Sequence, residues 1–328
     1  MIRSLQKTRF GRFYQCKAEE FLESRIGQRL RGKVQLVLTS PPFPLNNKKS
    51  YGNLYGKKYK QWLTAFAPIF SELLTDSGSI VIEIGNAWQP GRPVQSLLPI
   101  QSLMEFVQHP IAGLRLCQEF VCYNPSRLPS PAQWVTVERI RMTDSYTRIW
   151  WMAKTDSPKA NNNKVLRPYS KSMKVLLKRG SYNSGRRPSE HNIGQTSFLT
   201  NNGGSIMPNF IEIEQVDPGR ELRLPNVLSI SNTNSNDAFL TSCRAGGVIP
   251  HPARMPLQMA AFFIQFLTDQ ADLVLDPFAG SNTTGFVAEQ LQRRWVSIEA
   301  DNNYSNQSKI RFGQFNNGTL AGGVSKWG

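Results

Sequence analysis

The sequence predicts an α/β fold, in which a mostly parallel sheet carries helices on both faces and a loop-rich region is inserted. Residues 11–155 alternate apolar, strand-like stretches with stretches whose apolar residues recur at helical spacing. Residues 271–301 read as a strand, a glycine-containing loop, a helix and a second strand that ends in an acid. Alternating strands and helices of this kind favour an open α/β sheet.

Several elements can be placed along the first half of the chain. "VQLVLTS" at 34–40 and "GSIVIEIG" at 78–85 are short apolar runs bounded by turn residues, as expected of buried strands. Between them, "YKQWLTAFAPIFSELL" at 59–74 has apolar residues at the spacing of one helix face. "WVTVERIRM" at 134–142 and "TRIWWMAK" at 147–154 are predicted to form a pair of strands.

Composition indicates a globular protein with a polyanionic partner. The 328 residues are 40% hydrophobic and 10% aromatic, which is ordinary for a soluble domain. The formal net charge of +16 is not ordinary. Such an excess favours a nucleic acid or an acidic membrane surface as partner and says nothing about the fold.

Targeting and redox signals point to a reducing cytoplasm. No stretch reaches about 18 uninterrupted apolar residues, and "MIRSLQKTRFGRF" lacks the apolar core of a secretory signal. The four cysteines show no paired C-x-x-C spacing, so we expect free thiols and no metal site.

A basic, loop-rich stretch divides the chain. Residues 155–245 are rich in Asn, Ser, Gly and Pro, and Lys154 to Arg187 contain ten Lys or Arg against one acid, Asp156. A solvated insertion without a role is one interpretation, and a nucleic-acid contact surface is the other. The predicted layout is a folded domain in two parts, 1–155 and 246–315, with an insertion at 156–245 and a disordered tail at 316–328.

The run "TSPPF" ends the first apolar strand abruptly. Two prolines cannot extend a strand, because each lacks a backbone donor and fixes its own φ. The corner could be a simple chain reversal with Phe43 in the core. It could also hold the Ser40 hydroxyl and a carbonyl beside a flat ring, which would suit a planar substrate.

The glycine loop at 276–285 has the features of a nucleotide-cofactor site. Gly280 and Gly285 permit a tight turn close to a ligand, and Thr283 and Thr284 could cap the following helix. Glu299 ends the next strand, where an acid can accept hydrogen bonds from a ribose diol.

The type of cofactor follows from what the loop lacks. A phosphate-loop NTPase needs a Gly-Lys-Ser/Thr ending, which is absent, and a dinucleotide enzyme needs G-x-G-x-x-G. The acid Asp276 would repel a pyrophosphate and suits a ligand with a cationic end. We therefore interpret the loop as a site for S-adenosylmethionine. Because ligands collect at the carboxyl ends of strands in open α/β sheets, the Ser-Pro-Pro corner and this loop can face one cleft.

With these residues placed, the chain resembles the S-adenosylmethionine-dependent DNA amino-methyltransferases of cytosine-N4 type. "TSPPF" at 39–43 resembles their acceptor box and "DPFAGSNTTG" at 276–285 their donor loop. The acceptor box precedes the donor loop, as in the β-ordered class, in which the target-recognition insertion lies between them. Further matching segments are "YNPSRLPSPAQW" (123–134), "RPSEHNIG" (187–194), "NNGGSIMPN" (201–209) and "HPARMP" (251–256).

The resemblance implies a Rossmann-like methyltransferase sheet and a set of site residues. The catalytic residues it implies are Ser40, Pro41, Pro42 and Phe43. The cofactor-binding residues are Asp276, Pro277, Phe278, Gly280, Ser281, Asn282, Thr283, Glu299, His251 and Pro252. The DNA-binding residues are Lys48, Lys49, Lys171, Lys174, Arg186, Arg187 and His191.

The implied activity is site-specific methylation of the cytosine N4 amino group in double-stranded DNA, by base flipping and direct in-line transfer from S-adenosylmethionine. A type II restriction-modification system is the implied setting, with a monomer that makes no stable contact with a cognate endonuclease. Adenine-N6 methylation, a decayed enzyme that only binds DNA, and action on RNA remain alternatives. One departure concerns the adenine side of the cofactor, where Cys16-Lys17 stands in place of Gly-Asp.

Overall fold

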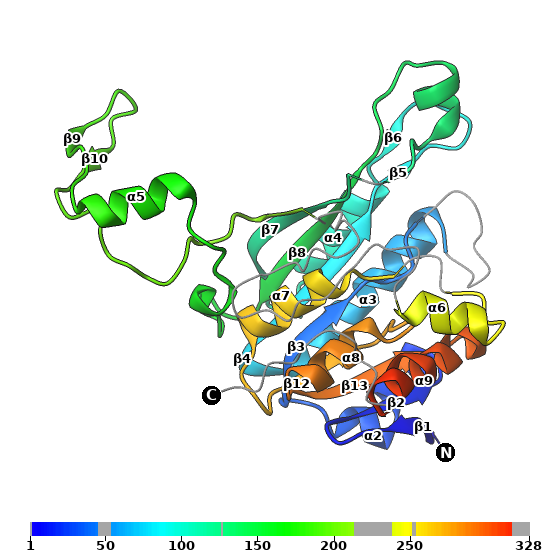
Figure 1. Ribbon diagram of the computed structural model, residues 1–328. Coiled ribbons are helices and arrows are strands. Elements are labelled where there is room, and N and C mark those ends of the chain that lie inside the picture. The colour runs from blue at the N-terminus through cyan, green and yellow to red at the C-terminus, as the bar shows by residue number, and fades with distance from the viewer. Residues whose placement is uncertain (1, 45–53, 126, 213–237, 251–253, 317–328) are drawn as a thin grey trace.

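The computed structural model describes residues 2–44, 54–125, 127–212, 238–250 and 254–316. Within these ranges the main feature is a nine-stranded sheet of order β1-β2-β13-β12-β3-β4-β8-β7-β11 (Figure 1). Its parallel centre consists of β2 (Gly11–Gln15), β13 (Arg294–Glu299), β12 (Leu273–Asp276), β3 (Val34–Thr39) and β4 (Leu74–Gly85). The predicted α/β class is confirmed.

The two ends of the sheet depart from the parallel arrangement. β1 (Ser4–Lys7) pairs antiparallel with β2, and β8 (Tyr146–Ala153) pairs antiparallel with β4. β7 (Arg115–Tyr123) is antiparallel to β8, and β11 (Phe210–Glu212) is parallel to β7. The strands β2, β13, β12, β3, β4 and β7 therefore all end at the same edge, which we call the carboxyl edge.

Helices cover both faces of this sheet (Figure 1). On one face lie α1 (Ala18–Glu23), α3 (Gly56–Leu73) and α4 (Leu98–Val107). On the other lie α7 (Leu257–Leu267), α8 (Thr283–Gln290) and α9 (Asn302–Asn316). The short helices α2 (Arg25–Gln28) and α6 (Ala238–Ala245) complete this part of the molecule.

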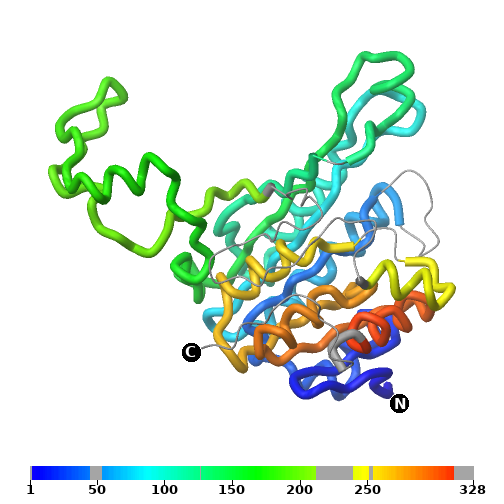
Figure 2. The backbone as a smooth tube through the Cα atoms, in the orientation of Figure 1, coloured from blue at the N-terminus to red at the C-terminus, as the bar shows by residue number. Residues whose placement is uncertain are grey.

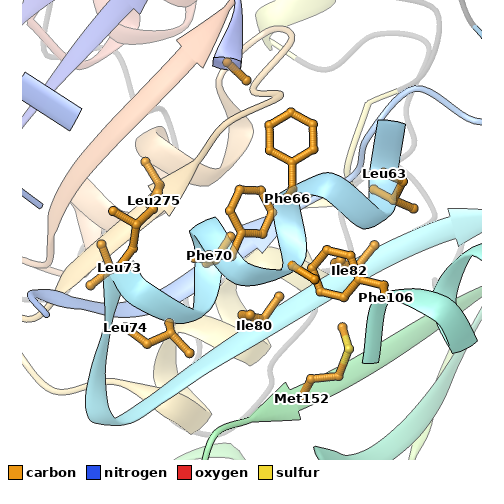
Figure 3. Packing of buried hydrophobic residues seen from close by; sticks show 14 of the residues in the cluster. Leu63, Phe66, Phe70, Leu73, Leu74, Ile80, Ile82, Phe106, Met152 and Leu275 are labelled. Carbon is orange, nitrogen blue, oxygen red and sulfur yellow. The ribbon is translucent and has the colours of Figure 1, made fainter. Parts of the chain in front are cut away.

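Sequence periodicity explains the core between α3 and the sheet. Leu63, Phe66 and Phe70 recur at helical spacing and are buried against the strands (Figure 3). Along β4, Ile80 and Ile82 point to this same cluster, whereas Val81 belongs to the cluster on the opposite face. The strand is buried on both sides, as expected at the centre of a parallel sheet.

The predicted strands at 34–40, 78–85 and 147–154 and the predicted helix at 59–74 are confirmed as β3, β4, β8 and α3. The strand predicted at 134–142 is wrong. Gln133–Val137 form a π-helical turn, and the amides of Ile140 and Arg141 donate to the Trp134 carbonyl. The Trp134 ring packs instead on the Trp88 ring, with centroids 5.9 Å apart, so tertiary contacts override β propensity.

Two projections leave the sheet on different sides (Figures 1 and 2). The arm comprises residues 86–97 and 127–145, including β5 (Ala87–Trp88) and β6 (Gln95–Ser96), and it stands beyond the end of β4. The lobe comprises residues 168–204, with α5 (Lys171–Arg179), β9 (Gly185–Arg186) and β10 (Asn192–Ile193). A bridge between Arg167 and Ser205 closes the base of the lobe.

The residues of the predicted insertion do not all lie in the lobe. The short helix η2 (Asn162–Val165) packs on α7, and β11 joins the main sheet. Residues 213–237 and the predicted tail from 317 onward lie outside the described residues. The four-part division of the chain therefore stays a prediction.

None of the helices in the described ranges has the length and apolar character that crossing a membrane requires.

Candidate functional site

The Ser-Pro-Pro-Phe corner lies directly after β3, at the carboxyl edge of the sheet. Thr39 and Pro41 are buried, while Ser40 and Phe43 are partly exposed. The Phe43 ring packs on the end of β4, so closely that a Cβ placed on Gly85 would lie 2.6 Å from ring carbon Cδ2. Only glycine at position 85 leaves room for this ring, which fixes the corner against the neighbouring strand.

Asp276 ends β12 and joins it to β3. Its Oδ1 accepts hydrogen bonds from the Thr39 hydroxyl at 2.7 Å and from the Phe278 amide at 3.1 Å, and its Oδ2 accepts one from the Thr284 hydroxyl at 2.7 Å. Burial raises the pKa of Asp276 to about 6, because removing a carboxylate from water disfavours its charged form. The acid therefore fastens the donor loop to the strand that carries the acceptor corner.

Glu299 shapes the glycine loop from the end of β13. Its Oε2 accepts the Gly280 amide and its Oε1 accepts the Asp301 amide, each at 2.8 Å. Gly280 has φ of +52°, a left-handed conformation that glycine adopts without a steric penalty. Burial raises the pKa of Glu299 above its ordinary value. Each carboxylate oxygen keeps a second lone pair for a ligand.

The cap of α8 differs from the prediction. Asn282, with φ of +61°, accepts the Gly285 amide at 3.2 Å, whereas Thr283 and Thr284 are the first two residues of the helix. The capping residue must precede the helix, whereas Thr284 lies inside it and donates its hydroxyl hydrogen to Asp276. Asn282 Nδ2 also donates to the Ser308 hydroxyl. Its side chain is thus directed into the protein.

Gly285 serves packing rather than a turn. It lies inside α8 with a Cβ position 2.8 Å from the Trp295 ring and 2.9 Å from the Ser297 hydroxyl oxygen. Glycine therefore allows α8 to approach β13, the role that a glycine has where a helix packs closely on a strand. The same position would also lie 2.2 Å from Asn282 Oδ1.

The corner and the loop face one cavity of about 510 Å³. All four residues of the corner line it, Ser40, Pro41, Pro42 and Phe43. From the cofactor set, the lining includes Asp276, Pro277, Phe278, Gly280, Ser281, Thr283 and Glu299. Asn282 is not among the described lining residues, and His251 and Pro252 lie outside the described part of the chain.

Two aromatic side chains form one wall of the cavity, and this aromatic wall was not predicted. Trp62 of α3 and Phe278 of the donor loop lie with ring centroids 5.3 Å apart, and Trp62 Nε1 donates to Glu19 at 2.7 Å. Lys17 and Glu19 both line the cavity, so the departure noted at Cys16-Lys17 falls on its rim. Trp62 had been interpreted only as part of an apolar helix face, because periodicity cannot tell a core residue from a cavity wall.

Glu83 is the functional residue that the sequence reasoning missed. It is 6% exposed near the end of β4, accepts the Thr147 hydroxyl at 2.7 Å and is hydrogen-bonded to Ser40. Burial raises its pKa, and the hydrogen bonds and the charge of Arg127 act in the opposite direction. An acid within the apolar run "IVIEIG" was the available signal, since a buried carboxylate needs partners.

The predicted DNA-contacting residues separate into two groups. Lys171 and Lys174 lie on α5, and Arg186, Arg187 and His191 lie in or beside the β9–β10 hairpin, so all five belong to the lobe. Arg187 is held by the Tyr182 ring and by the Asn183 carbonyl, and Arg186 pairs with Glu190 at 3.4 Å. Lys48 and Lys49 lie outside the described residues.

These features define a class of protein. An open α/β sheet, a glycine loop held by a strand-end acid and a cavity of this size fit a nucleotide-like ligand, and the buried carboxylates fit one with a cationic end. No group of three His, Cys, Asp or Glu within the described ranges is arranged to hold a metal ion. The fold and site are those of an S-adenosylmethionine-dependent methyltransferase.

The chain belongs to the DNA methylase family, whose model matches residues 34–309. It is 40% identical over 304 residues to the type II methyltransferase M.PvuII of Proteus hauseri, a match that covers 92% of this chain and 83% of that protein. The similarity to the β-ordered cytosine-N4 enzymes expected from the motifs is thereby confirmed.

Comparison with solved structures agrees with this family assignment. The PvuII DNA methyltransferase (cytosine-N4-specific) superposes with a TM-score of 0.69 at 32% identity, covering 94% of this chain and 90% of that one. The M1.HpyAVI complex with S-adenosylmethionine, at 17% identity and a TM-score of 0.50, covers 92% of this chain and 98% of that one and shares the fold.

Proposed function

We propose that this protein transfers a methyl group from S-adenosylmethionine to the exocyclic N4 amino group of cytosine, at a specific site in double-stranded DNA. The observation that carries this proposal is the position of the Ser40–Phe43 corner. It faces the same cavity as the donor loop, and the 2.7 Å bond between Thr39 and Asp276 joins the two. The similarity to the PvuII enzyme, which is cytosine-N4-specific and matches most of this chain, supports the choice of base.

The acceptor side must activate a poor nucleophile. The lone pair of the cytosine amino nitrogen is delocalised into the ring. The Ser40 hydroxyl oxygen and the Pro41 carbonyl each accept one amino hydrogen, which draws the nitrogen toward a tetrahedral geometry. Phe43 stacks on the pyrimidine ring. The prolines hold both acceptors in place beforehand, so no reorganisation is needed at the moment of reaction.

Glu83 completes the acceptor side. As a carboxylate it accepts the Ser40 hydroxyl proton, so that the lone pairs of Ser40 are turned toward the substrate amino group. After the transfer the amino nitrogen carries an extra proton, and the Ser40–Glu83 pair can receive it. No covalent bond between enzyme and base is required.

The opposite side of the cavity holds the cofactor. Glu299 would accept hydrogen bonds from the ribose hydroxyls, the aromatic wall of Trp62 and Phe278 would contact the adenine, and Gly280 would allow close backbone approach. When bound, S-adenosylmethionine supplies an electrophilic methyl group on a positively charged sulfur. Asp276 contributes negative charge close to that end of the site.

The target base must leave the duplex to reach this cavity, at a cost of a few kcal/mol. Phosphate contacts from the basic lobe help to offset that cost, and Lys171, Lys174, Arg186 and Arg187 are the residues assigned to them. In this assignment residues 156–245 recognise the target, while 1–155 and 246–315 form the two parts of the catalytic domain.

The biological setting follows from the type II methyltransferase that the chain resembles. We assign this protein to the modification half of a type II restriction-modification system in the bacterial cytoplasm. We further propose that it acts as a monomer and makes no stable contact with a cognate endonuclease.

Expression in bacterial cells without other cytosine-N4 methylation tests the function. Nucleoside analysis of the DNA should reveal N4-methylcytosine, and sequencing with methylation assigned per base should place it at one short site. The Ser40→Ala variant is the negative control. Detection of N6-methyladenine instead, or of no methylated base with a folded, cofactor-binding protein, would overturn the proposal.

A further inference from the structure

The foot of the arm is connected to the acceptor corner. Ser40 is hydrogen-bonded to Glu83, and Glu83 also accepts the hydroxyl of Thr147, the residue after Tyr146 in β8, at 2.7 Å. Arg127 Nη1 donates to the Tyr146 carbonyl at 3.1 Å, and the Arg127 amide donates to the Asn124 carbonyl at 3.2 Å. The backbone at position 127 is therefore held at the carboxyl edge of the sheet, near the β8 residues that contact Glu83.

Leu128 follows at once and points away from the protein. Its side chain is 82% exposed, although the chain around it is fixed: Arg127 is bonded to Tyr146 on one side, and the Asp144 amide donates to the Ser130 carbonyl on the other. Leu128 is not among the described residues that line the cavity. It is thus an exposed apolar side chain outside the cavity, next to a residue that is bonded to β8 close to Glu83.

The rest of the arm has the chemistry of a surface that meets a duplex. Within the described part of the arm, four arginines (Arg92, Arg127, Arg139, Arg141) stand against two acids, Glu138 and Asp144. Asp144 already accepts hydrogen bonds from the Asn86 side-chain amide at 2.8 Å and from the Trp88 indole at 3.4 Å. Exposed apolar side chains lie among these arginines: Val94, Leu97, Val137, Ile140 and Met142. Arginine cations can contact the DNA phosphates, and the apolar side chains beside them can contact the stacked bases.

We propose that Leu128 enters the DNA stack and fills the space that the flipped cytosine leaves behind. The proposal rests on the proposed function, because only an enzyme that extracts a base creates this space. A leucine suits the role, since it has no polar atom that would lose a hydrogen bond between the flanking bases. Filling the space keeps the flipped state from collapsing and leaves the unpaired guanine stacked.

The test uses a duplex that carries the recognition site found by sequencing. In one duplex the target is pyrrolocytosine, which pairs with guanine and brightens when it leaves the stack. Leu128→Ala should reduce the brightening and slow single-turnover methylation of the ordinary duplex by about 10- to 100-fold, the range for exposing one leucine. Leu128→Met should keep most of both signals, and affinity for S-adenosylmethionine should not change.

Ile111→Ala is the matched control. Ile111 is 80% exposed, but it precedes β7, at the edge of the sheet opposite the corner, so this variant should behave as the wild type. A second duplex places the target cytosine opposite an abasic position, where leaving the stack breaks no base pair. The deficit of Leu128→Ala should shrink there, which a merely structural role would not produce.

Three outcomes overturn the inference while the proposed function stands. These are unchanged methylation and brightening in Leu128→Ala, an equal deficit on the paired and abasic duplexes, or a wild-type dimer that Leu128→Ala dissociates. A wild type that methylates no cytosine would instead overturn the proposed function itself.

Discussion

At the scale of single residues, the proposed acceptor corner and the donor loop are each held by a partner from a distant part of the chain. Thr39 of the acceptor half bonds Asp276 of the donor half, and Gly280 is held by Glu299 of the next strand. Ser40 is oriented by Glu83 of the neighbouring strand. Positioning by fixed hydrogen bonds suits a reaction in which the enzyme supplies no nucleophile.

Ser40→Ala should lower turnover by about 10²-fold or more, the scale for losing one positioned polar group, with nearly intact binding of S-adenosylmethionine. Glu83→Gln, which keeps the shape and loses the charge, should also lower turnover. In the Ser40→Ala background, the added Glu83→Gln change should lower turnover much less, because the two residues act as a unit. Single-turnover rates of the three variants measure this coupling. Additive effects would separate Glu83 from the acceptor role.

The affinity for S-adenosylmethionine should depend on Asp276 through pH. Burial raises the pKa of Asp276 to about 6, so the group is charged above that pH and mostly protonated at pH 5. A cationic ligand favours the charged form. If binding lowers this pKa by one unit, affinity falls about 5-fold between pH 7.5 and pH 5, on the way to a limit of about 10-fold at lower pH. Calorimetry at the two pH values measures it.

Asp276→Asn is the control for this dependence. The asparagine has nearly the same shape and no charge, so affinity should be lower at pH 7.5 and should change less with pH. Any dependence that remains reports on Glu299, whose pKa is also raised by burial. A pH dependence equal to that of the wild type would show that Asp276 does not sense the cofactor charge.

At the scale of elements, close packing of α8 on β13 sets the shape of the donor loop. Asn282 begins the helix, Gly285 brings it against Trp295, and Trp295 donates its indole hydrogen to the buried Glu289 at 2.7 Å. The loop lies between two elements that cannot move apart without losing these contacts. Its backbone is therefore preorganised for a ligand.

Gly285→Ala should destabilise the protein by about 1–3 kcal/mol, the usual cost of overpacking, because its Cβ would lie 2.2 Å from Asn282 Oδ1. Thermal or urea unfolding measures the change. Gly313→Ala is the matched control, since Gly313 also lies in a helix and an added Cβ meets nothing within 4 Å. That variant should gain roughly 0.5–1 kcal/mol from helix propensity. Equal effects of the two changes would contradict the packing role.

At the scale of the whole molecule, the two projections carry different kinds of side chain. The lobe carries the basic residues assigned to phosphates, and the arm carries the apolar side chains and arginines beside the cavity. The two leave the sheet on different sides (Figure 1). A duplex bound by both would be fixed by electrostatics at the lobe and by its base stack at the arm.

Neutralising Lys171, Lys174, Arg186 and Arg187 together should weaken binding of all DNA sequences alike. The slope of log affinity against log salt should flatten by roughly 0.9 for each lost phosphate contact. His191→Ala is expected to act differently, relaxing discrimination at one base pair at a cost of about 1–3 kcal/mol. Binding measured at several salt concentrations, with cognate and altered sites, separates the two behaviours.

A charge-matched control keeps this test specific. Arg12, Arg25, Arg29 and Lys33 are exposed residues of the first strands and helices, away from the lobe. Neutralising these four removes the same charge and should leave the slope nearly unchanged. If both sets flatten the slope equally, only net charge matters and the lobe has no special role.

The sequence by itself determined the α/β class, the positions of β3, β4, β8, β12 and α3, and the two motifs that meet at the cavity. These follow from short-range information, because periodicity, proline corners and glycine loops each involve neighbouring residues. The motif order also indicated the family before any coordinates were considered.

Only the tertiary structure decided which distant side chains serve the site. Glu83 reaches Ser40, and Asp276 reaches Thr39, because β3 lies between β4 and β12 in the sheet. Strand order depends on long-range packing that no local pattern records. For the same reason residues 134–142 have a strand-like pattern and yet begin with a helical turn in the arm, where Trp134 packs on Trp88 of β5.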